Sequence, residues 1–245
     1  MIIADFPKID YAYWLKNYSW EGFSSIRGMI TTMINKQHIE HDITEKNITD
    51  KICVKIKNYR SSQNDNLLFE IFKLIQTWGG KSAGRHTLDI IDKWDENSLS
   101  KYKVFVNKII NNEVIDSFNY LVKTNKIKGL SYSFVPKHIC FWSGNGDRMK
   151  GYPILDDIIS ILVYNAKSAK NVSYEIFIRD INNFTKQLNN NFIDNQQLNL
   201  AQIEMAIFAF SGYYWKTKKT GTKEFKFKNL EHHKNFEEAI RISNR

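Results

Sequence analysis

Hydrophobic residues recur every three or four positions along most of this chain, which is the spacing of one buried face of an α-helix. The pattern is clearest at residues 66–78, where it places Leu67, Leu68, Ile71, Phe72, Ile75 and Trp78 together. Only 11 glycines and 3 prolines interrupt the 245 residues. Many short strands would need more of these turn-forming residues, so the sequence predicts a mainly α fold.

The same spacing predicts further helices at residues 24–40, 86–94, 99–111, 113–125, 133–143, 156–164, 173–190, 198–211 and 234–242. The aromatic-rich residues 1–21 are expected to form an arm or a short helix. Residues 42–62 are polar around a β-like run, Ile52-Cys53-Val54, and the pattern gives them no clear place. Gly79 is expected to end the 66–78 helix in the left-handed conformation.

Charge and cysteine content narrow the classes of function. A formal net charge of +9 and a pI near 9.3 favour a polyanionic partner, nucleic acid before an anionic membrane. The two cysteines, Cys53 and Cys140, form neither a disulfide framework nor a zinc motif, and are too few for a four-cysteine iron–sulfur cluster. We therefore expect neither a metal nor a cofactor. No secretion signal or membrane span is recognisable, so a cytoplasmic location is expected.

The most informative stretch is a helical hairpin at about residues 113–143, followed by an aspartate. Gly129 lies in the turn between the two expected helices, where the backbone must bend tightly and approach a DNA phosphate closely. Lys126 and Lys128 flank it and Ser131 follows it, so all four are candidate DNA contacts. Lys137 is expected one to two turns into the second helix, and Asp156 follows it by 19 residues at the start of another helix.

Two stretches here, Lys128-Gly129-Leu130-Ser131-Tyr132-Ser133-Phe134-Val135-Pro136-Lys137 and Pro153-Ile154-Leu155-Asp156, carry a family resemblance. With Thr77-Trp78-Gly79 upstream and Glu204 downstream, the chain resembles the 8-oxoguanine DNA glycosylase (OGG) fold family of helix-hairpin-helix DNA glycosylases, in particular its bacterial members. The resemblance covers about residues 65–210. It implies a single glycosylase unit over residues 1–245 with two helical lobes, acting as a monomer on double-stranded DNA from which one base is flipped out.

The resemblance also implies roles for two residues. Lys137 would attack C1′ of the flipped nucleotide and form a Schiff base, with AP-lyase cleavage of the strand to follow. Asp156 would take up a proton or stabilise positive charge on the sugar. The excised base would be 8-oxoguanine-like, in DNA repair, or a modified base of phage DNA, in antiphage defence.

The hairpin departs from the usual pattern of the family. Common members carry Gly-x-Gly with the lysine two residues after the second glycine. Here Ser131 replaces that glycine, Lys137 lies six residues beyond it, and Ser133 occupies the position four residues before Lys137 on the same expected helix face. In the standard register the enzyme would be monofunctional, with Asp156 activating water.

Each candidate also has a purely structural interpretation. Lys137 is then a surface lysine, and Asp156 an N-cap for which Asp157 competes. Glu204 is a buried structural residue. Three further residues are expected either to line the base pocket or to pack in the core: Ser133, Phe141 and Trp78.

Residues 212–228 are the most basic part of the chain and interleave lysines with aromatics. Lys216, Lys218 and Lys219 are candidate DNA contacts there, and a solvated lysine face is the alternative. A catalytically silent DNA-binding module is the alternative function for the whole chain. A helical scaffold for protein interactions would leave the net charge unexplained.

Overall fold

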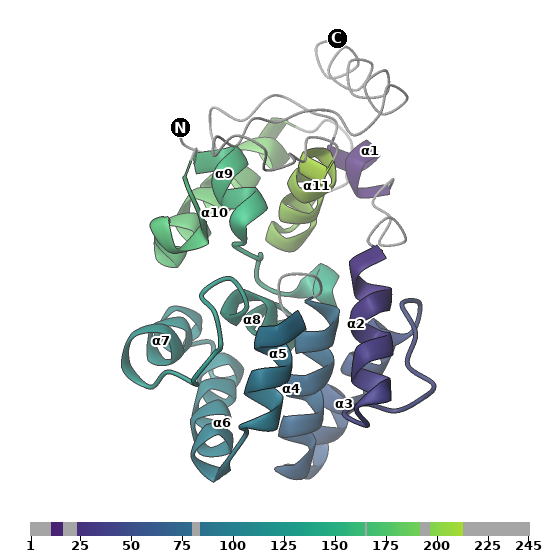
Figure 1. The fold of residues 1–245 in the computed structure, drawn as a ribbon. Coiled ribbons are helices and arrows are strands. Elements are labelled where there is room, and N and C mark those ends of the chain that lie inside the picture. Colours follow the sequence, from purple (N-terminus) through teal and green to yellow (C-terminus); the bar gives the residue numbers. More distant parts are fainter. Residues whose placement is uncertain (1–10, 17–23, 80–83, 165, 192–196, 213–245) are drawn as a thin grey trace. The chain divides into compact units, whose positions relative to one another are not determined.

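A computed structural model describes residues 11–16, 24–79, 84–164, 166–191 and 197–212 (Figure 1). Every regular element in these ranges is helical and none is a strand, which confirms the mainly α prediction. Within the same ranges, no helix has both the length and the apolar character needed to cross a membrane. The chain divides into two compact units. We call Trp20–Ile154 the central unit, and Met1–Ser19 with Leu155–Arg245 the terminal unit.

The central unit is organised around one helix, α4, which packs against α2, α3, α5, α6 and α8. Its described helices are α2 (Ser24–Asn35), α3 (Ile48–Ser62), α4 (Asn66–Trp78), α5 (Gly84–Asp92), α6 (Glu96–Ile110), α7 (Val114–Asn119) with a π-helical continuation (Tyr120–Thr124), α8 (Val135–Ser143) and a 3-10 turn (Arg148–Lys150). In α4, Leu68, Ile71, Phe72, Leu74, Ile75 and Trp78 are all buried. A helix that is apolar on most sides is stable only when neighbours cover it, so α4 lies in the core.

The terminal unit repeats this arrangement with α11 as its centre. Its described helices are α1 (Tyr11–Lys16), α9 (Asp157–Tyr164), a 3-10 turn (Ala169–Asn171), α10 (Tyr174–Asn191) and α11 (Leu200–Gly212). Helix α11 packs against α1, α9 and α10, and its residues from Ile203 to Ala209 are all buried. Segments far apart in the sequence thus contribute to one unit, because α1 packs on α11.

The segment at residues 42–62 differs most from the sequence expectation. The β-like run is wrong, since Ile52 and its neighbours lie within α3. Ile48, Ile52, Ile56 and Tyr59 recur at helical spacing and are buried against the unit. Their contact with α4 outweighs the local strand preference of β-branched residues.

Three helix boundaries also need correction. Helix α2 ends at Asn35, not residue 40. Gly79 has φ −60°, so the left-handed cap expected there is wrong. Helix α8 begins at Val135, not residue 133, because the preceding residues form a turn in which the Phe134 N–H donates to the Ser131 carbonyl at 3.0 Å.

Candidate functional site

The turn before α8 requires glycine at position 129. Gly129 has φ +91°, in the left-handed region that favours glycine. A Cβ at this position would lie 2.6 Å from Cγ1 of Ile90 in α5. The Leu130 N–H closes the turn by donating to the Ile127 carbonyl at 3.1 Å, and Ile127 is buried. The tight turn expected at Gly129 is therefore present, and the core of the central unit holds it in place.

The turn exposes backbone donors that the described part of the chain does not use. The N–H groups of Lys128, Gly129, Ser131 and Ser133 donate to no atom of the described residues. Lys128, Gly129 and Ser131 are exposed, and Ser133 is half-buried. Backbone N–H groups that share one turn are well suited to bind the oxygens of a phosphate.

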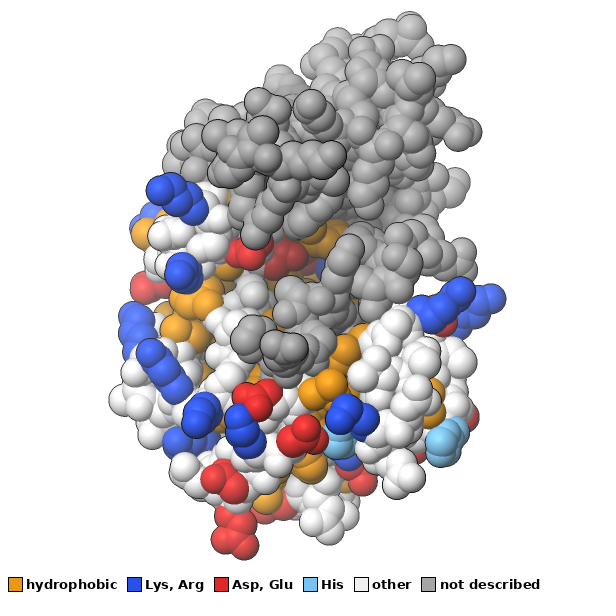
Figure 2. Space-filling view, viewed as in Figure 1, with side chains coloured by type: hydrophobic (Ala, Val, Ile, Leu, Met, Phe, Trp, Pro, Cys, Tyr) orange, Lys and Arg blue, Asp and Glu red, His pale blue; other side chains and the backbone are white. Residues whose placement is uncertain are grey.

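Lys123, Lys126 and Lys128 lie in this turn or shortly before it along the chain, and Lys101 contacts it from α6. Among the described residues, no carboxylate forms an ion pair with any of them. The Lys101 amine donates to the Lys126 carbonyl at 3.4 Å, which brings α6 next to the turn. Figure 2 shows lysine and arginine side chains gathered along the edge where α6 and α7 lie. This region, which we call the hairpin face, therefore carries lysines that form no ion pair with a carboxylate in the described part of the chain.

Lys137 lies in the first turn of α8, not one to two turns into it. Its half-buried amine donates to the Gly79 carbonyl at 3.0 Å. The same nitrogen lies 4.3 Å from the centre of the Phe134 ring. Ser133 precedes the helix, so it does not share a helix face with Lys137, and its hydroxyl is 3.4 Å from that of Ser131. Lys137 is thus a half-buried lysine that contacts the backbone and an aromatic ring, and the surface-lysine interpretation is incomplete.

The aromatic candidates for a base pocket lie inside the central unit. Trp78 and Phe141 are buried and pack edge to face, with ring centres 4.9 Å apart. The guanidinium of Arg148, also buried, lies 4.9 Å from the Trp78 ring. These contacts are those expected of core packing, which was the alternative role for both rings.

Asp156 is the N-cap of α9, as its position before an apolar run predicts. Its carboxylate accepts a hydrogen bond from the Ile159 N–H at 2.9 Å, and its carbonyl accepts one from the Ser160 hydroxyl at 2.6 Å. The competing Asp157 has a different structural partner, the Ala169 N–H at 2.8 Å. Lys137 belongs to the central unit and Asp156 to the terminal unit, because the chain passes from one to the other after Ile154.

The remaining candidates are either buried or outside the described residues. Glu204 is 1% exposed in α11, in accord with its interpretation as a buried residue. Lys216, Lys218 and Lys219 lie outside the described residues, as do the rest of the basic stretch beyond residue 212 and the helix expected at 234–242.

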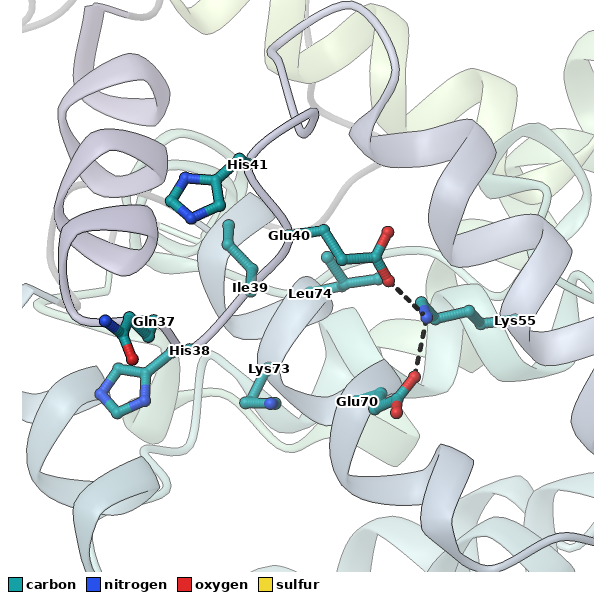
Figure 3. A pocket seen from close by; sticks show the side chains of 9 residues that line it. All are labelled: Gln37, His38, Ile39, Glu40, His41, Lys55, Glu70, Lys73 and Leu74. Atoms are coloured by element: carbon teal, nitrogen blue, oxygen red, sulfur yellow. Dashed lines mark hydrogen bonds and ion pairs between the residues drawn. The ribbon is translucent and has the colours of Figure 1, made fainter.

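A pocket of about 390 Å³ lies elsewhere on the central unit, and no sequence pattern indicated it. The loop after α2 and parts of α3 and α4 line it (Figure 3). Lys55 bridges two carboxylates across it, Glu40 at 2.9 Å and Glu70 at 2.7 Å. Burial lowers the pKa of Lys73, which also lines the pocket. Charges in this pocket are thus largely balanced within the protein, in contrast to the hairpin face.

No group of three or more His, Cys, Asp or Glu side chains suited to a metal ion occurs in the ranges described above. Comparison with known proteins gave no match to a family model, to a curated protein or to a solved structure.

Proposed function

We propose that this chain is a DNA N-glycosylase that flips out and excises a damaged or modified base. The observation that carries the proposal is the Gly129 turn, whose backbone N–H groups are unused by the described residues, with Lys137 in the first turn of the following helix. A phosphate bound by the turn would bring the sugar–phosphate backbone near the start of α8. The lysines of the hairpin face would add sequence-independent affinity for that backbone.

The chemistry assigned to Lys137 is nucleophilic. Its Nζ would form a bond to C1′ of the flipped nucleotide while the bond from C1′ to the base nitrogen breaks, and the base leaves with the electron pair and takes up a proton. The Asp156 carboxylate would stabilise positive charge on the sugar and accept the proton lost by the amine. Ring opening then gives the imine from which β-elimination cleaves the strand.

The substrate we propose is an 8-oxoguanine-like base or a modified base of phage DNA. In either case the enzyme would act on a base outside the stack, because the target atom is C1′ and the duplex shields it.

One contact favours a second candidate, a DNA-binding module without excision. The Lys137 amine donates to the Gly79 carbonyl at the C-terminal end of α4. A cation at a helix C-terminus stabilises the helix dipole, so Lys137 has a structural use even without a substrate. A third possibility lies between these two candidates: the chain excises the base through water activated at Asp156 and forms no Schiff base.

Borohydride trapping separates these candidates. The wild-type chain is mixed with duplexes carrying 8-oxoguanine or phage-type modified bases, and the covalent adduct is measured after reduction. We expect an adduct with at least one substrate and its loss, by about 100-fold or more, in Lys137→Gln. Lys103→Gln, which removes a lysine paired with Asp65 in the same unit, is the matched control and should trap normally.

The outcomes are distinct. If the wild type excises the base without forming an adduct, and Lys137→Gln excises it equally well, only the mechanism in which Asp156 activates water remains. DNA binding with neither excision nor trapping on any substrate would show that the chain is a binding module.

Asp156 has a structural use and a proposed chemical use, and two substitutions distinguish them. Asn is as good an N-cap as Asp, whereas Ala costs about 1 kcal/mol of stability. We expect Asp156→Asn to keep the melting temperature and to lower single-turnover excision by about 100-fold or more, on the scale of a lost acid–base group. Asp157→Asn is the control. An Asp156→Asn variant with normal excision would limit Asp156 to its capping role.

A further inference from the structure

A chain of polar side chains runs through the core of the central unit beside Lys137. His138, the next residue in α8, is completely buried. Its Nε2 lies 2.9 Å from the Gln76 amide nitrogen of α4, and its Nδ1 lies 2.8 Å from the Tyr102 hydroxyl of α6. The Trp142 indole N–H of α8 donates to the same hydroxyl at 2.8 Å, and the Thr87 hydroxyl of α5 donates to the Gln76 amide oxygen at 3.5 Å.

Both ring nitrogens of His138 are therefore occupied. An amide nitrogen only donates, so with this orientation of Gln76 the imidazole Nε2 accepts and Nδ1 carries the hydrogen. The ring also stacks on Phe72 of α4, with centres 4.9 Å apart and planes 22° apart. Burial, with the nearby charge of Lys137, lowers the pKa of His138 to about 3. The imidazole is therefore neutral. Stacking on Phe72 holds the plane of the ring, and the contacts with Gln76 and Tyr102 hold its two nitrogens.

This arrangement constrains Lys137 as well. Successive helix residues point about 100° apart, so holding residue 138 toward α4 and α6 sets the direction of residue 137. That direction takes the Lys137 amine to the Gly79 carbonyl at the end of α4. Helix α4 thus binds both residues, His138 through Gln76 and Lys137 through Gly79.

We infer that His138, through its bonds to Gln76 and Tyr102, is a positioning residue that fixes the rotation of α8 and with it the place of the Lys137 amine. The value of this device for catalysis rests on the proposed function, but the positioning itself does not. Replacing both partners of a buried hydrogen bond by well-packed apolar groups can leave stability nearly unchanged. What a buried polar network adds, when both nitrogens of its central ring have partners, is a single orientation of the helices that it joins.

The test measures the chemical accessibility of the Lys137 amine and needs no substrate. Lysines of the full chain are acylated briefly with an amine-reactive ester, and the labelling rate of Lys137 is measured by mass spectrometry relative to exposed Lys128. His138→Ala risks unfolding, so the variants are Tyr102→Phe and Gln76→Met, each of which removes one partner of the ring. Ile139→Val, which trims a buried residue of α8 outside the network, is the control.

We expect the relative labelling of Lys137 to rise at least threefold in both network variants and to stay within 1.5-fold of wild type in the control, each at a temperature equally far below its own melting point. A Lys137 labelling ratio that does not differ between the network variants and Ile139→Val would overturn the inference. Borohydride trapping is a separate readout, so a failure of the proposed function is recognised independently. If wild type traps, Tyr102→Phe should lower the trapping rate and leave the Kd for DNA within about twofold.

Discussion

Two lysine-rich regions of the central unit differ in how their charge is balanced. At the pocket, Lys55 is paired with Glu40 and Glu70, and Lys51, which also contacts Glu40, is paired with Asp42. On the hairpin face, Lys126 and Lys128 have no carboxylate partner among the described residues. The net charge of the chain does not distinguish the two regions, because it counts all lysines alike. Of these two regions as the structure describes them, the hairpin face is the one where lysines without a carboxylate partner lie next to unused backbone donors, so it is the better candidate for a phosphate.

The largest expected effect is on DNA affinity. If Lys126 and Lys128 each contact one phosphate, removing both reduces the slope of log K against log salt by about 1.8 and weakens binding roughly 50-fold at 0.1 M salt. The test compares Lys126→Gln/Lys128→Gln with Lys51→Gln/Lys55→Gln by fluorescence anisotropy over a salt series. Both double variants change the net charge by the same amount. Equal losses of DNA affinity would therefore contradict a phosphate site on the hairpin face.

Glycine substitutions test, through the free energy of unfolding, whether the turn of the hairpin face requires glycine. Gly129→Ala forces an L residue to φ +91° and places its Cβ against Ile90, so we expect a loss of about 2 kcal/mol. Gly28, within α2, has open space around the position that a Cβ would occupy. Gly28→Ala should therefore gain about 0.5–1 kcal/mol as an ordinary helix substitution. Denaturant unfolding measures both, and a neutral Gly129→Ala would mean that the turn relaxes easily.

The sequence predicted α4 to the residue, because its apolar spacing is strong and neighbours on several sides reinforce it. The sequence did not predict α3, because the one buried face of this helix is separated along the chain by many polar residues. The start of α8 was recoverable, since Pro136 falls within the first two positions of the helix, where proline is favoured. That signal would have placed Lys137 in the first turn.

The contacts around Lys137 had no comparable sequence signal. Gln76, Tyr102 and His138 come from three helices and are far apart along the chain. Nothing in local spacing indicates that three polar residues meet in a core, since only tertiary packing brings them together. The hairpin turn was predictable because Gly129 acts within its own segment, whereas the position of the amine depends on distant partners.

The smallest expected effect is that of Lys55→Gln on acid stability, where the two regions respond in different pH windows. The pKa of His138 is about 3, below its value of about 6.5 in the unfolded chain. The unfolded state therefore binds a proton first, and stability falls as pH drops below about 6.5. The pKa of Glu40 is also lowered, chiefly by the hydrogen bond from Lys55. Its contribution is present above the unfolded pKa of about 4.3 and is lost as pH falls further.

Lys55→Gln separates the two windows. Removing the ammonium takes away the main cause of the lowered Glu40 pKa, so the variant should lose less stability than wild type below about pH 4.3. The decline that begins near pH 6.5 should remain, because His138 contacts neither Lys55 nor Glu40 in the contacts above. Melting temperatures from pH 7 to pH 3 test both limbs. Glu40 is largely exposed, so solvent screening keeps its contribution to the free energy of unfolding small. A change in the decline that begins near pH 6.5 in Lys55→Gln would mean that the two regions are coupled.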